Sequence, residues 1–209
     1  MRISLSFLLP LLCLLSIISA SAAQNFSARE KSIFEKNLEL YREGDYKQAE
    51  QNFALVVAKL PESAYITSNY LMLVKSQYKL GDYVSAIDQA KIFLSKFSNS
   101  HYRDDVLYTM GNAYYKLNRF QSATKLWISA LDESNDPRLA GKIEVLVTGT
   151  VRDMLNDEDI KKLSTEIGTY ADGRMLLDIA WAEKLYAEGS ITKGNSILNA
   201  ALTELPANK

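Results

Sequence analysis

Three stretches of this chain repeat one pattern at an interval of 37 residues. Gly44, Gly81 and Asn118 lie 37 positions apart. Two positions after each comes an aromatic residue, and five positions after each comes alanine: Tyr46 and Ala49, Tyr83 and Ala86, Phe120 and Ala123. Three columns seldom stay in phase by chance, so the chain contains an internal repeat. A repeat of this length predicts stacked supersecondary units instead of one closed core.

Each repeat is predicted to be a pair of helices joined by a tight turn. Gly44 and Gly81 stand where a helix can end in a left-handed conformation, and asparagine is the usual substitute there. Asp45 and Asp82 follow as expected N-caps of the next helix. The second helix of each unit then places its core residues in steps of three and four: Tyr46, Ala49, Phe53 and Val56; Tyr83, Ala86, Ala90 and Phe93; Phe120, Ala123, Trp127 and Ala130.

This pattern resembles the tetratricopeptide repeat (TPR). The third unit carries the most signature residues: Met110, Gly111, Tyr114, Phe120, Ala123, Ala130 and Leu131. The resemblance implies an all-α fold, a right-handed α-solenoid of about five TPR-like helix hairpins within residues 24–209. Its units are expected at about 27–62, 63–99, 100–135, 136–171 and 172–207. The fourth unit lacks the signature, but Asp136-Pro137 and Asn156 are typical helix starts.

The first 23 residues are predicted to be a secretory signal peptide that precedes the solenoid. Arg2 is followed by an apolar run, and Ala20-Ser21-Ala22 suits a signal peptidase. The run is short for a membrane span, so no stable span is expected after cleavage. Cys13 is the only cysteine, and Leu12 precedes it where a lipoprotein needs a small residue. The sequence therefore predicts a protein that is secreted across the inner membrane, periplasmic and not a lipoprotein.

Composition and motifs give no indication of an enzyme. The chain has 24 basic and 25 acidic residues, so no positive field favours nucleic acid. His101 is the only histidine, and no Gly-rich phosphate loop is present. Asp157-Glu158-Asp159 is better explained by the first turn of a helix than by a metal, because it lacks the glycine and final glutamate of a calcium loop. No catalytic residue, metal site or cofactor is predicted.

A column of tyrosines is the strongest candidate for a binding site. Tyr41, Tyr78 and Tyr115 are 37 apart, each is followed by a cation, and the last unit has Tyr186. The TPR resemblance places such positions of the first helix on the inner wall of the solenoid, where phenols and cations suit a peptide. The alternative is that these tyrosines only pack against the neighbouring helix. The predicted groove residues are Tyr41, Arg42, Lys75, Tyr78, Lys79, Tyr108, Asn112, Tyr115, Lys116 and Tyr186.

The first functional hypothesis is a scaffold for protein–protein interaction in the bacterial cell envelope, with a protein or peptide held in the concave groove. The chain is similar in style to the TPR partner of the Tol–Pal system and to outer-membrane assembly TPR proteins. A second hypothesis is the N-terminal helical module of a longer penicillin-binding-protein activator, which would regulate peptidoglycan synthesis. A third, an envelope hydrolase, has no motif in its favour. The sequence specifies neither the partner, the pathway nor the oligomeric state.

Overall fold

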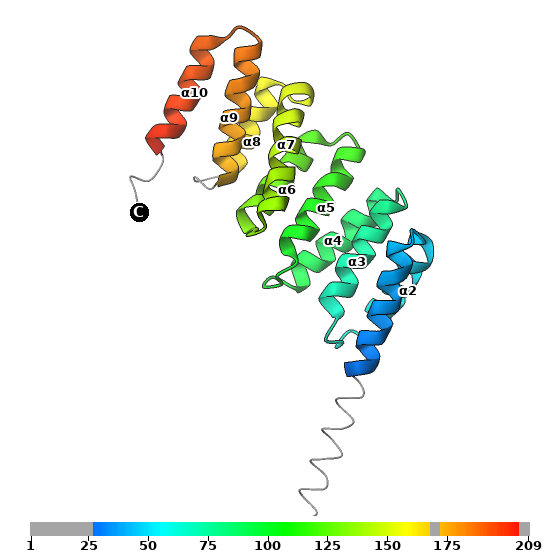
Figure 1. The fold of residues 1–209 in the computed structure, drawn as a ribbon. Coiled ribbons are helices and arrows are strands. Elements are labelled where there is room, and N and C mark those ends of the chain that lie inside the picture. Colours follow the sequence, from blue (N-terminus) through cyan, green and yellow to red (C-terminus); the bar gives the residue numbers. More distant parts are fainter. Residues whose placement is uncertain (1–26, 168–171, 205–209) are drawn as a thin grey trace, which may run out of the picture.

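The computed structural model describes residues 27–167 and 172–204, and within these ranges the regular elements are helices (Figure 1). The predicted all-α fold is confirmed. The signal peptide, Cys13 and the last residues of the fifth unit lie outside the described residues. The helices are residues 27–42, α2 (Tyr46–Lys59), α3 (Ile66–Lys79), α4 (Tyr83–Lys96), α5 (Arg103–Lys116), α6 (Phe120–Glu133), α7 (Pro137–Met154), α8 (Asp157–Ile167), α9 (Asp172–Ala187) and α10 (Ile191–Glu204).

The turns inside the repeats have the conformation that their sequence predicts. Gly44, Gly81 and Asn118 all have positive φ, at 88°, 80° and 58°. Asp45 then caps α2, because its side chain accepts a hydrogen bond from the backbone N–H of Gln48 at 3.1 Å. In the first two turns, a left-handed glycine followed by a capping aspartate ends one helix and starts the next in a fixed register. In the third turn Asn118 has the left-handed conformation, but Arg119 after it makes no side-chain cap.

Removing one of these caps is expected to cost about 1 kcal/mol of unfolding free energy. Asp82 accepts a hydrogen bond from the N–H of Ser85 at 3.1 Å at the start of α4. Asp82→Ala leaves that amide without its partner, and urea unfolding followed by circular dichroism measures the loss. Asp88→Ala is the matched control, because Asp88 is an exposed carboxylate on the same helix. An equal loss in both variants would mean that the cap contributes nothing specific.

Glycines let neighbouring helices approach closely inside the stack. A Cβ on Gly111 of α5 would lie 2.6 Å from Cδ1 of Trp127 on α6. A Cβ on Gly173 of α9 would overlap the side chain of Ile128 in the same way. These two contacts bring large α6 side chains directly against the backbones of α5 and α9. Gly111, a signature residue of the third repeat, is thus a position of close helix approach.

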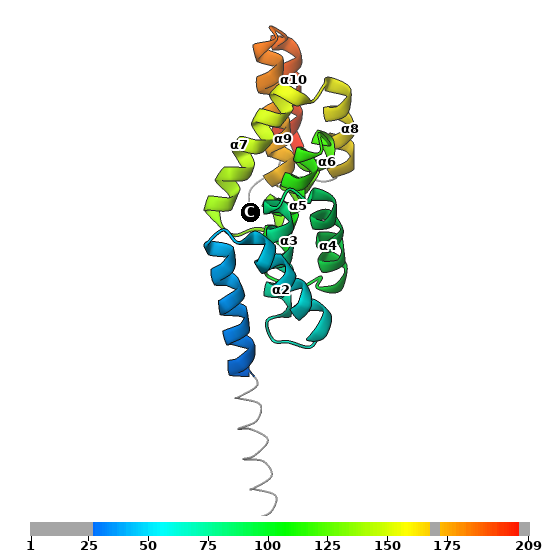
Figure 2. The same ribbon diagram turned by 90° about the vertical axis from the view of Figure 1, so that its right-hand side faces the viewer.

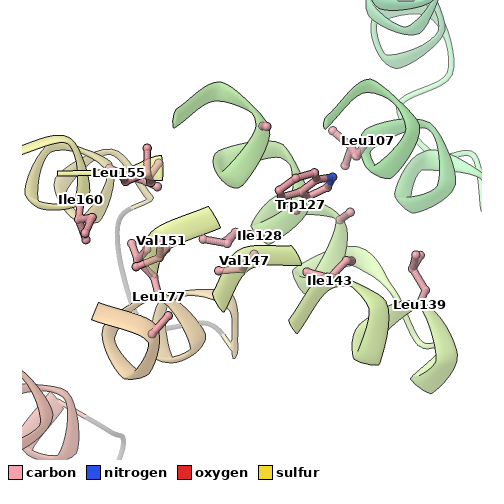
Figure 3. Packing of buried hydrophobic residues seen from close by; sticks show 14 residues of the cluster. Leu107, Trp127, Ile128, Leu139, Ile143, Val147, Val151, Leu155, Ile160 and Leu177 are labelled. Carbon is pink, nitrogen blue, oxygen red and sulfur yellow. The ribbon is translucent and has the colours of Figure 1, made fainter. Parts of the chain in front are cut away.

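The hairpins stack into an elongated array whose first helices form the inner wall. Figure 2 shows helix 27–42 and α7 projecting on the same side, with α3 and α5 set back between them. Three clusters of buried apolar side chains lie along the array, one for each group of neighbouring helices. The largest joins α5 to α9 and contains Trp127, Ile143 and Val147 (Figure 3). A concave inner wall follows from this stacking.

The fourth unit departs from the hairpin that the repeat model predicts. Its helices exist, and Asp136 and Asn156 both cap them as expected. However, α7 packs along α6 and α9, and α8 also packs against α6 and α9, so the two helices are not paired along each other as in the earlier units. The buried residues of α7 explain this, since Ile143, Val147 and Val151 form one stripe at steps of four within the largest cluster.

Candidate functional site

A groove of about 1260 Å³ lies on the inner wall. Helix 27–42, α3, α5 and the start of α7 line it, together with the segment just before α5. These are the first helices of four successive units, which follow one another along the array in Figure 2. The groove brings together seven of the ten residues that the sequence predicts: Tyr41, Arg42, Lys75, Tyr78, Lys79, Tyr108 and Asn112.

The other three predicted residues lie outside the groove. Tyr115 packs against Phe120 and Trp127, with ring centroids 5.2 and 5.7 Å away. Lys116 is exposed as the last residue of α5 and does not line the groove. Tyr186 donates its hydroxyl to Oδ1 of Asn195 at 2.7 Å, beyond the α9–α10 turn. Of the four tyrosines in the column, Tyr41 and Tyr78 line the groove, whereas Tyr115 and Tyr186 do not.

Tyr41 and Tyr78, the two tyrosines of the column that line the groove, each pack a ring against another phenol and carry a hydroxyl. The ring of Tyr41 lies 5.1 Å from that of Tyr46, and the ring of Tyr78 lies 5.6 Å from that of Tyr83. Burial, with a smaller contribution from the neighbouring phenol, raises the pKa of both Tyr41 and Tyr78 above the usual value. Both hydroxyls therefore stay protonated at neutral pH and can donate hydrogen bonds to a ligand.

The cations of the groove differ in how they are paired. Lys75 on α3 forms an ion pair with Asp105 on α5, with 2.8 Å between Nζ and Oδ1. Arg42 reaches Glu39 of its own helix at 3.5 Å. Lys79 lies 5.9 Å from the centroid of the Tyr46 ring. Contacts between exposed groups at such distances are weak, so Arg42 and Lys79 remain available to an anion.

The 37-residue column indicates neither the aspartates of the groove nor its fourth wall. Asp104 and Asp105 lie in the first turn of α5, and both also line the groove. Arg138 and Lys142 come from α7, whose unit carries no repeat signature. The 37-residue column could not indicate them, because no equivalent position in the fourth unit can be assigned from the pattern. His101 also lines the groove.

The described residues offer neither a cluster of metal ligands nor a helix that could span a membrane. In residues 27–167 and 172–204, no group of three or more His, Cys, Asp and Glu side chains could hold a metal ion. Over those same residues, none of the helices has the length and apolar character needed to cross a bilayer. The groove brings phenols, cations and carboxylates together on one surface.

A family model described as "YfiO: Outer membrane lipoprotein" matches residues 27–140, more than half of the chain. The chain belongs to this family. The match covers the first three helix pairs and the start of α7, and so almost the whole groove. Membership in the YfiO family agrees with the predicted resemblance to outer-membrane assembly TPR proteins.

The chain is also similar to individual proteins. A protein of Aquifex aeolicus (strain VF5), described as outer membrane protein assembly factor BamD, is 34% identical over an alignment of 110 residues that covers 49% of this chain. The match spans only 35% of that relative's length. A kinesin light chain of Podosopora anserina with TPR-like repeats has 15% identity and a TM-score of 0.48, covering 85% of this chain and 94% of that one. A structure of Naa15/Naa10 bound to HypK-THB has 18% identity and a TM-score of 0.47, covering 87% and 26%.

Family membership corrects one prediction. The expectation of a periplasmic protein that is not a lipoprotein is wrong, because the YfiO family is one of outer membrane lipoproteins. The expectation depended on the single residue before Cys13, which is Leu12 instead of a small residue. The helical repeat at 27–140 carries the family assignment, and the identity of residue 12 does not outweigh it.

Proposed function

We propose that this chain is a scaffold in outer membrane protein assembly that holds a segment of a partner polypeptide in its inner groove. The observation that carries the proposal is the groove itself, formed by four successive first helices in the part of the chain that matches the YfiO family. The name of the Aquifex relative, an outer membrane protein assembly factor, supports the pathway. The role is binding and not catalysis.

The groove offers the contacts that an extended or helical peptide needs. Tyr41 and Tyr78 donate hydrogen bonds to peptide carbonyls, and their rings give contact area at a small entropic cost. Arg42 and Lys79 attract carboxylates at one end. Leu38, Met72 and Leu139 are apolar residues that line the same hollow. A surface that combines these groups recognises a polypeptide through backbone, charge and apolar contacts together.

Site-specific photocrosslinking tests this proposal. Benzoylphenylalanine replaces Tyr108, which lines the groove on α5. The matched control replaces Leu55, which is 58% exposed on α2 and does not line the groove. Irradiation of cells that express the full chain should give crosslinked envelope proteins from position 108. The crosslinks should disappear when Arg42 and Lys79 are changed to glutamate. Equal crosslinking from positions 55 and 108 would contradict the proposal.

Membership in a lipoprotein family gives a separate prediction about anchoring. Cys13 is the only thiol in the chain and therefore the only residue at which a thioether-linked lipid can be attached. We expect cells to incorporate labelled palmitate into the wild-type protein and not into Cys13→Ser, which should lose its membrane association. An unlabelled wild-type protein would show that this member of the family lacks the anchor.

A further inference from the structure

One ion pair in the groove joins two units directly. Lys75 of α3 and Asp105 of α5 are 2.8 Å apart, and their side chains are 28% and 40% exposed. Both residues line the groove, and α3 packs directly against α5. The pair is therefore accessible to a ligand, and it neutralises a cation in the middle of the surface where we propose that the partner binds.

The other two groove carboxylates have local structural roles. Oδ1 of Asp104 accepts a hydrogen bond from the backbone N–H of Asp105 at 2.8 Å. Oδ1 of Asp136 caps α7 through the N–H of Arg138 at 2.9 Å and also contacts the Arg138 guanidinium. By contrast, the described contact of the Asp105 carboxylate is the ammonium group of Lys75 on another helix. Asp105 thus holds a groove cation in the way that a ligand carboxylate would.

We propose that Asp105 is an intramolecular competitor for acidic groups of the partner. This inference depends on the proposed function of the groove. A carboxylate of the partner can pair with Lys75 only after displacing Asp105, and it must also approach the negative charge of Asp105 itself. Asp105 therefore lowers the affinity of the groove for acidic segments and makes binding reversible. It also disfavours acidic chains that offer the groove no other contact.

The test compares two neighbouring aspartates. The probe is a fluorescein-labelled peptide of twelve residues with alternating Glu and Ala, and a Gln–Ala peptide is its neutral counterpart. Fluorescence anisotropy with the mature full chain gives the affinities. Asp105→Asn should bind the Glu–Ala peptide about tenfold more tightly than the wild type, because Lys75 is freed. Asp104→Asn changes the net charge equally at the adjacent position and should tighten binding less than about threefold.

Lys75→Met completes the comparison as a double-mutant cycle. Lys75→Met should bind the acidic peptide more weakly than the wild type does. Adding Asp105→Asn to Lys75→Met should raise the affinity much less than Asp105→Asn raises it in the wild-type background. Circular dichroism confirms that each variant is folded. If the wild type binds the Glu–Ala peptide and Asp105→Asn does not tighten it, or if both aspartate variants tighten it equally, the competitor role is overturned. If no variant prefers the Glu–Ala to the Gln–Ala peptide, acidic recognition by the groove is overturned as well.

Discussion

Trp127→Ala is expected to lower the free energy of unfolding by about 3–5 kcal/mol, the usual cost of truncating a buried aromatic side chain. Trp127 is fully buried on α6 in the largest apolar cluster. Figure 3 shows its ring between Leu107 of α5 and the α7 stripe that includes Ile143. Its Nε1 also donates to Oδ1 of Asn112 at 3.0 Å. Removing the ring leaves a cavity between three helices, and urea unfolding measures the loss.

Two further variants separate the ring from its hydrogen bond. Trp127→Phe keeps most of the apolar volume and is expected to cost about 1–2 kcal/mol, since Asn112 loses its partner and a smaller cavity remains. Leu55→Ala truncates an exposed side chain on α2 and should change stability by less than about 0.5 kcal/mol. A Trp127→Ala loss no larger than that of Leu55→Ala would contradict the assignment of this cluster as the core.

The features that could be predicted from the sequence are those that the local chain determines. A glycine with positive φ followed by a capping aspartate specifies where one helix ends and the next begins, whatever surrounds it. Gly44 and Gly81 with Asp45 and Asp82 therefore gave the helix boundaries of the first units. Tyr41 and Tyr78 both line the groove, because their helices keep the register of the repeat.

The features that could not be predicted depend on side-chain size in a neighbouring helix. Phe53, Ala90 and Trp127 occupy equivalent positions 37 residues apart. The third unit has the largest side chain there, and Tyr115 packs against it, with 5.7 Å between the ring centroids, instead of lining the groove. A repeat column shows which positions are equivalent, but it does not show which neighbour covers them.

The contribution of α7 to the groove could not be predicted either, because it depends on how α7 packs against other helices. Its buried stripe packs along α9 as well as α6, and this arrangement places the start of α7 at the groove. Arg138, Leu139 and Lys142 form that end of the wall. Asp104, Asp105 and Asp136 line the groove together with these cations, whereas Arg42 and Lys79 lie at the C-terminal ends of their helices. A ligand in this groove consequently meets carboxylates and cations together at the starts of α5 and α7, and the cations Arg42 and Lys79 at the ends of helix 27–42 and α3.

Reversing both of those cations is expected to weaken binding of the Glu–Ala peptide roughly 30-fold. Arg42 and Lys79 are exposed at helix ends, so Arg42→Glu with Lys79→Glu should leave the fold intact. Each reversal replaces an attraction by a repulsion worth about 1 kcal/mol at a partly exposed site, and about 2 kcal/mol corresponds to this change in affinity. Fluorescence anisotropy at about 0.1 M salt measures the effect, which should shrink at higher ionic strength because salt screens exposed charges.

The matched control reverses two lysines that do not line the groove. Lys47→Glu with Lys91→Glu changes the net charge of the chain by the same amount at exposed positions of α2 and α4. If the peptide responds only to net charge, both double variants should lose affinity equally. Because a groove contact acts within a few ångströms and a remote charge is screened beyond about 10 Å, we expect less than a threefold loss in the control. Equal losses in the two variants would show that the acidic peptide is bound elsewhere, or held only by the overall field of the protein.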